Sequence, residues 1–78
     1  MDPVSCETID CRRLLCPMPV IRVQDRIAEL HSGDQLTAVC TDPGVMQDIP
    51  AWCRINGHAV LSAEESDGEY RVTVRVGG

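Results

Sequence analysis

The sequence predicts an α/β two-layer sandwich in which the elements follow the order β-α-β-α-β-β. Segments 17–30 and 45–56 carry apolar residues at intervals of three and four, the period of an amphipathic helix. Four shorter segments are predicted to be strands: 6–11, 35–41, 58–64 and 70–76. Because strand–helix–strand connections are right-handed, both helices should cover one face of a four-stranded sheet.

The first helix is predicted to run from Pro17 to Leu30. Pro17 suits the first helical position, where no backbone N–H is needed, and Gly33 is the expected left-handed cap. One face of this segment is apolar, at Val20, Val23, Ile27 and Leu30. The segment therefore predicts a helix that packs on the sheet.

The second helix contains a proline. Val45, Ile49 and Trp52 share one helical face, and Gly57 should end the helix. Because Pro50 removes a backbone donor, we expect a bent or two-piece helix, with Asp48 capping the second piece. Asp42 is expected to cap the start of the segment.

The last two strands are predicted to form a hairpin closed by a turn at 65–68. In segment 70–76, Tyr and Val alternate with Arg and Thr, which is typical of a strand with one buried and one solvated face.

Size and charge limit the possible functions. The chain has 78 residues, enough for a single domain (1–78) with one modest core, and a net charge of −5 with seven Arg and no Lys. An acidic balance argues against direct nucleic-acid binding, which needs clustered cations. No segment approaches the roughly 18 apolar residues of a membrane span, and no leader sequence is visible. We expect a cytoplasmic protein that neither enters a membrane nor binds nucleic acid directly.

The five cysteines do not follow a disulfide or metal pattern. Their number is odd, no two are spaced as Cys-x-x-Cys, and the two histidines are isolated. We therefore expect free or transiently modified thiols in a reducing compartment, with no metal and no other cofactor.

Cys16 is the strongest candidate for chemistry. It lies in the run Cys16-Pro17-Met18-Pro19, at the predicted start of the first helix. Helix N-termini favour negative charge, so a thiol there should ionise more readily than a free one, and the thiolate is the reactive form. The prolines should stiffen the turn, and the amides of Met18 and Val20 are candidates to point at the sulfur.

Several runs of the sequence resemble the TusA/SirA family of sulfur carriers, from about Ile9 to Gly78. The resemblance rests on Asp10, Leu15-Cys16-Pro17-Met18-Pro19-Val20, Thr41-Asp42-Pro43, Asp48-Ile49-Pro50-Ala51-Trp52-Cys53 and Gly57-His58.

The resemblance implies a four-stranded mixed sheet in the order 1-2-4-3 and a small cytoplasmic protein. It also implies that Cys16 carries sulfur as a persulfide. A cysteine desulfurase or a rhodanese-type protein would donate the sulfur, and a further protein would accept it. Relatives serve tRNA thiolation, molybdenum cofactor synthesis or dissimilatory sulfur oxidation.

Two residues before the motif are expected to support it. Relatives commonly carry glycine where this chain has Arg13, and we expect this arginine to adopt ordinary backbone angles and add a cation near Cys16. Asp10 is expected to bond Arg12 or the backbone of the Cys16 loop.

The other thiols have two interpretations each. Cys53 is a possible second thiol that shelters or receives sulfur from Cys16, or else a small core residue. Cys40 is expected in the core, and Cys6 and Cys11 on opposite sheet faces. A redox switch between Cys11 and Cys16 is an alternative role.

Two rival functions remain. The terminal Gly77-Gly78 is typical of ubiquitin-like carriers that form a thiocarboxylate, although those proteins need no Cys-Pro turn. A regulatory module whose thiol senses oxidants would use the same thiolate as a carrier. We expect a monomer, because the hydrophobic pattern of the predicted helices and strands leaves no apolar stripe over for contact with a second copy.

Overall fold

The computed structural model describes residues 5–15 and 17–77, which form the predicted β-α-β-α-β-β succession. The fold class predicted from the sequence is confirmed. The elements are β1 (Cys6–Cys11), α1 (Met18–Ile27), β2 (Gln35–Cys40), α2 (Val45–Asn56), β3 (Ala59–Ser66) and β4 (Glu69–Arg75).

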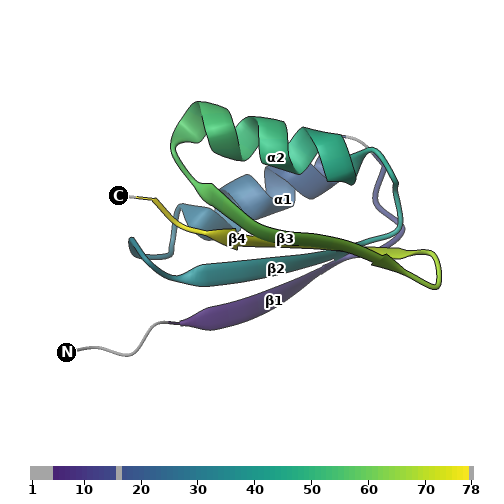
Figure 1. Cartoon of the computed structure of the whole chain (residues 1–78), viewed down its shortest axis with the longest axis horizontal. Coiled ribbons are helices and arrows are strands. Elements are labelled where there is room, and N and C mark those ends of the chain that lie inside the picture. The colour runs from purple at the N-terminus through teal and green to yellow at the C-terminus, as the bar shows by residue number, and fades with distance from the viewer. Residues whose placement is uncertain (1–4, 16, 78) are drawn as a thin grey trace.

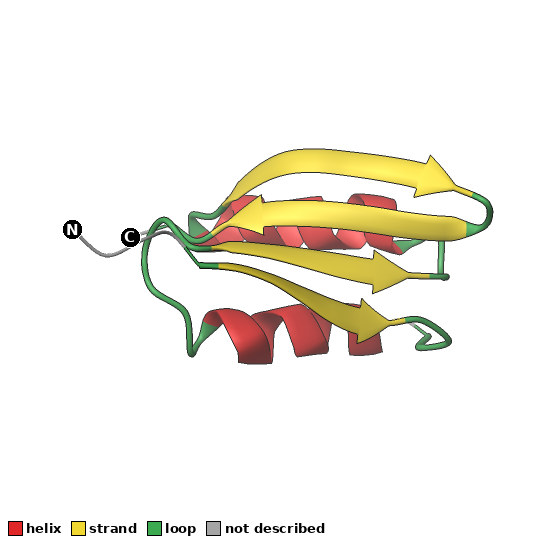
Figure 2. Cartoon of the chain, turned by 90° about the horizontal axis from the view of Figure 1, so that it is seen from below, coloured by secondary structure: helices red, strands yellow, loops and turns green. Residues whose placement is uncertain are grey.

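The four strands form one mixed sheet in the order β1-β2-β4-β3, as the family resemblance implied. β1 runs parallel to β2, while β4 is antiparallel to both β2 and β3. Both helices cover the same face of the sheet (Figure 1) and leave the other face open to solvent (Figure 2). The connections from β1 to α1 and from β2 to α2 therefore lie at one edge of the sheet, where the parallel strands end (Figure 2).

The core lies between the sheet and the two helices. It is built from small and medium-sized apolar side chains, because the chain has no Phe. The largest fully buried side chains are Leu36, Ile49, Val23, Val45, Val72, Val74, Pro19, Cys11, Cys40 and Cys53. Trp52 is partly buried and packs against this core, with its ring stacked on that of His58 at a centroid distance of 5.2 Å.

Helix α1 is shorter than the sequence predicted. Pro17 is the N-cap residue and not the first helical residue, and the helix ends at Ile27, followed by a turn in which the Leu30 amide bonds the Ile27 carbonyl. Gly33 has a positive φ of 93° but lies beyond that turn, so its predicted role as the helix cap is wrong. The extra turn lets the chain reverse before β2 begins.

Helix α2 is continuous from Val45 to Asn56, so the prediction that it forms two pieces is wrong. The Asp48 amide donates to the Gly44 carbonyl at 2.9 Å, which places Asp48 inside the first turn and not at a second cap. Pro50 follows within the next turn and removes one backbone donor without ending the helix. Gly57 ends the helix in the left-handed conformation (φ 79°), as predicted.

The β3–β4 hairpin is tighter than predicted. Its loop consists of Asp67 and Gly68, both with positive φ, the conformation of a two-residue hairpin turn that matches strand twist. The paired strands therefore extend to Ser66 and Glu69. In the described part of the chain, no helix has the length and apolar character needed to cross a membrane.

Replacing the buried Ile49 by alanine tests the core. Ile49 is fully buried beneath α2, so Ile49→Ala should lower the free energy of unfolding by about 2–4 kcal/mol, through lost burial and the cavity left behind. The matched control is Ile55→Ala on the same helix, where the side chain is 83 % exposed and the change should stay within roughly 0.5 kcal/mol. Urea unfolding measures both variants, and equal losses would contradict this packing.

Candidate functional site

The Cys-Pro turn connects β1 to α1 at the edge of the sheet where the parallel strands end. Cys16 itself lies outside the described residues. The residues on either side, Leu15 and Pro17, are both exposed, and Leu15 is 76 % exposed. α1 begins at Met18, so the positive end of its dipole faces this turn.

A charged cluster fixes the start of this turn. The Arg12 amide and Nε both donate to Asp10 Oδ1 at 3.0 Å, and Arg12 Nη1 donates to Glu69 Oε2 at 3.2 Å. The expectation that Asp10 bonds Arg12 is confirmed. These bonds hold the pKa of the Asp10 carboxyl below its usual range, chiefly through the Arg12 side chain. Because Glu69 begins β4, the cluster also ties the turn to a strand far away in sequence.

Arg13 adopts a left-handed backbone conformation, with φ of 66°. The expectation of ordinary backbone angles is wrong at this residue. Its amide donates to Thr41 Oγ1 at 2.8 Å, and Thr41 directly follows β2, so this bond joins the two connections at the sheet edge. A left-handed conformation costs an L-residue energy that glycine avoids, so glycine would suit this position better than arginine.

One side of the turn is a polar hollow of about 450 Å³. It is bordered by Asp10, Arg12, Arg13, Thr41 and Glu69. The sequence predicted Asp10 and Arg13 as supporting residues but gave no role to Glu69 or to the Thr41 hydroxyl. Thr41 belongs to the Thr-Asp-Pro run of the family resemblance. No local sequence signal marked Glu69, which reaches Arg12 only because β4 lies next to β2 in the sheet.

The beginning of α1 carries exposed apolar side chains. Leu15, Met18 and Ile21 are 76 %, 38 % and 39 % exposed, respectively. The expectation that no apolar surface is left over is therefore wrong. The Met18 amide donates to the Leu15 carbonyl at 2.8 Å, so this candidate donor for the sulfur already has an acceptor. Pro19 is buried and anchors the first turn of the helix in the core.

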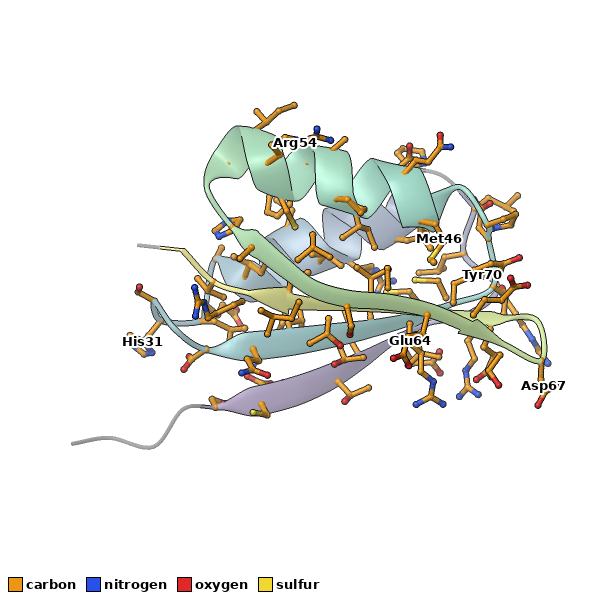
Figure 3. All side chains as sticks on the ribbon, in the orientation of Figure 1. His31, Met46, Arg54, Glu64, Asp67 and Tyr70 are labelled. Atoms are coloured by element: carbon orange, nitrogen blue, oxygen red, sulfur yellow. The ribbon has the colours of Figure 1, made fainter. Side chains whose placement is uncertain are left out.

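The start of α2 lies at the same edge of the sheet. Asp42 Oδ1 accepts a hydrogen bond from the Gly44 amide at 3.1 Å and so stabilises the turn that enters the helix. The N-cap residue of α2 is Gly44, without a side-chain cap bond, so the expectation that Asp42 caps the helix is wrong. Figure 3 places Met46 and Tyr70 at this end of the molecule and His31 at the opposite end.

Among the four cysteines that the structure describes, only Cys6 is exposed. Cys11 and Cys40 are fully buried, which confirms the core position of Cys40 and the opposite faces of Cys6 and Cys11. Cys53 is also fully buried, and burial raises the pKa of its thiol to about 11. It lies eight residues beyond Val45, about 12 Å further along α2 at the helical rise per residue, and so away from the edge that carries the Cys-Pro turn.

Comparison with known proteins identifies the family. The family model for sulfurtransferase TusA matches residues 7–76, almost the whole chain and all of the edge just described. The chain belongs to the TusA family. Sulfur carriage is therefore its general activity.

Individual relatives agree with this assignment. Proteins described as sulfur carriers in Neisseria meningitidis serogroups A and B are each 39 % identical over 72 residues, which cover 92 % of this chain and 97 % of theirs. The sulfur carrier protein TusA of Pseudomonas entomophila is 35 % identical over 74 residues, 95 % of this chain and 92 % of its own. The crystal structure of a SirA-like protein from Desulfitobacterium hafniense has the same fold, with a TM-score of 0.82, 30 % identity and coverage of 92 % of this chain and 99 % of that one.

Glycine at position 13 should stabilise the protein. Arg13→Gly removes a left-handed penalty of about 1–2 kcal/mol and adds about 0.5–1 kcal/mol of backbone entropy cost, for a net gain of roughly 0.5–1 kcal/mol in unfolding free energy. Arg13→Ala is the matched control, because it removes the same side chain but keeps the strained backbone. Urea unfolding should show a gain for glycine alone; a glycine variant no more stable than the alanine variant would contradict a left-handed penalty of this size.

Proposed function

We propose that Cys16 carries sulfane sulfur as a persulfide between a donor protein and an acceptor protein. Family membership over residues 7–76 is the observation that carries this proposal. The surroundings support it: the residues on both sides of Cys16 are exposed, and the turn lies between a polar hollow and exposed apolar side chains. A second protein can therefore approach the turn without any element of this chain moving aside.

The transfer needs neither a metal nor an external oxidant. The Cys16 thiolate attacks the outer sulfur of a donor persulfide, a new S–S bond forms on Cys16, and the donor leaves as a thiolate. Sulfur moves with no net change in oxidation state, and the reverse attack by an acceptor thiol releases it. The N-terminus of α1 and the Arg13 cation favour the Cys16 thiolate, which is the attacking group when sulfur is loaded and the leaving group when sulfur is released.

The neighbours of Cys16 have positioning roles in this proposal. Pro17 and Pro19 stiffen the turn, and the buried Pro19 holds the helix start against the core. Asp10 fixes Arg12 and with it the point where β1 passes into the turn. Met18 contributes a half-exposed, adaptable apolar surface for partner proteins.

The partners follow from this chemistry and from the charge of the chain. A cysteine desulfurase or a rhodanese-type protein supplies the sulfur, and a protein acceptor passes it to tRNA thiolation, molybdenum cofactor synthesis or sulfur oxidation. With a net charge of −5, the chain leaves the binding of any tRNA to a partner. We propose a cytoplasmic protein, without a cofactor, that binds its partners transiently.

Sulfur loading tests the role of Cys16. After incubation with a cysteine desulfurase and cysteine, the intact mass should rise by one sulfur atom that a reductant removes. Cys16→Ser should abolish this gain, while Cys6→Ser, which replaces the exposed cysteine of β1, should load like wild type. Uptake by Cys16→Ser equal to that of wild type would refute the proposal.

The terminal glycines give a second test, because a thiocarboxylate carrier needs its last residue. Gly77 already has a structural reason to be glycine: its amide donates to His58 Nδ1 at 2.9 Å, and a Cβ there would lie 1.8 Å from the Gly57 carbonyl oxygen. Deletion of Gly78, which lies outside the described residues, should leave sulfur loading unchanged. Loss of loading in the mass spectrum would instead support the thiocarboxylate alternative.

A further inference from the structure

Cys11 and Cys40 face each other across the first two strands. They are the last residues of β1 and β2 and are direct partners in the parallel register. Both side chains are fully buried on the face that the helices cover. Neighbouring strands lie about 4.8 Å apart, within the roughly 4.4–6.8 Å that a disulfide spans between Cα atoms.

We infer that Cys11 and Cys40 form a second reactive site, a dithiol that a hydroperoxide converts to a cross-strand disulfide. This inference does not depend on sulfur carriage by Cys16. In the first step, the Cys11 thiolate attacks the terminal peroxide oxygen and the O–O bond breaks. Cys11 becomes a sulfenic acid, and the other oxygen leaves as hydroxide from hydrogen peroxide or as an alkoxide from an organic hydroperoxide. In the second step, Cys40 attacks the sulfenic sulfur, and water leaves as the S–S bond forms. Two thiols are oxidised and one peroxide is reduced.

The surroundings give the two thiols different roles. Cys11 lies on the edge strand of the sheet and borders a surface hollow of about 220 Å³ between β1 and α1, whose rim includes Arg22. A small oxidant in this hollow reaches Cys11 after a slight local opening of the edge strand. Cys40 lies on the next strand inward, behind Cys11, and is not among the residues that border the hollow. Cys11 is therefore the attacking thiol and Cys40 the resolving one.

The electrostatics agree with this division. Burial raises the pKa of both thiols, and at Cys11 the charge of Arg22 counteracts part of that rise while the charge of Asp10 adds to it. At Cys40, no cation offsets the effect of burial, and the nearby Cys11, Asp42 and Asp10 add to it and raise the pKa to about 12. Cys11 thus ionises more readily than Cys40.

The disulfide would lie directly beneath the Cys-Pro turn. Cys11 precedes Arg12, and Cys40 precedes Thr41, whose hydroxyl holds the Arg13 amide. Oxidation therefore links covalently the two chain segments that this hydrogen bond already joins. The two thiols can therefore react with oxidants directly next to the turn that carries Cys16.

The test uses the full chain carrying Cys6→Ser, Cys16→Ser and Cys53→Ala, so that Cys11 and Cys40 are the only thiols left. Treatment with one equivalent of hydrogen peroxide, without denaturant, should reduce the titratable thiols from two to none. The intact monomer should lose two hydrogens in mass, and digestion should yield one peptide that links Cys11 to Cys40. Circular dichroism before treatment checks that the background is folded. If it is not, differential alkylation and peptide sequencing of the wild-type protein give the same answer.

Two further variants in this background test the direction of the reaction. With Cys40→Ala, Cys11 should accumulate as a sulfenic acid that dimedone traps; with Cys11→Ala, Cys40 should react at least about tenfold more slowly, because it lies on the inner strand and does not border the hollow. The inference is overturned if both thiols survive a peroxide dose that oxidises Cys16 in the wild-type protein. Disulfide-linked dimers in place of the internal bond would overturn it equally.

Discussion

Parallel pairing of β1 with β2 is the constraint on which the site depends. Because the two strands run in the same direction, each must be followed by a connection that starts at the same edge of the sheet, and both connections lead into helices on one face. The hydrogen bond from the Arg13 amide to Thr41 Oγ1 then joins these connections at 2.8 Å. The Cys-Pro turn is thus held by the sheet itself, although the chain is too small to enclose a deep pocket.

This arrangement lets a small domain do chemistry with few residues. The core is made of short aliphatic side chains and three buried cysteines, and it supplies rigidity but no reactive group to the carrier step. Charges lie around the turn, where Arg12 bonds both Asp10 and Glu69. Apolar surface lies on the other side, at the start of α1. The specificity of sulfur transfer therefore depends on which protein surface fits this edge.

The sequence predicted the elements and their order well, because hydrophobic periodicity and turn residues are local signals. The α2 helix shows where local rules fail: Pro50 suggested a break, but packing of Val45, Ile49 and Cys53 on the sheet keeps the helix continuous. Arg13 shows the same limit, since a left-handed arginine contradicts residue preference and is explained only by a contact made 28 positions away. Glu69 reaches the site only because β4 lies next to β2 in the sheet, and this arrangement leaves no local sequence signal at Glu69. For Cys16, the evidence remains the motif and the family.

The two ends of the described chain lie away from this edge. β1 begins and β4 finishes on the side opposite the Cys-Pro turn, where the Gly33 amide bonds the Val76 carbonyl and the Gln35 amide bonds that of Ser5. A polypeptide appended at either end would therefore emerge behind the working surface. The protein can be fused to a larger enzyme, or immobilised on a bead, without blocking the access of partner proteins to the Cys-Pro turn.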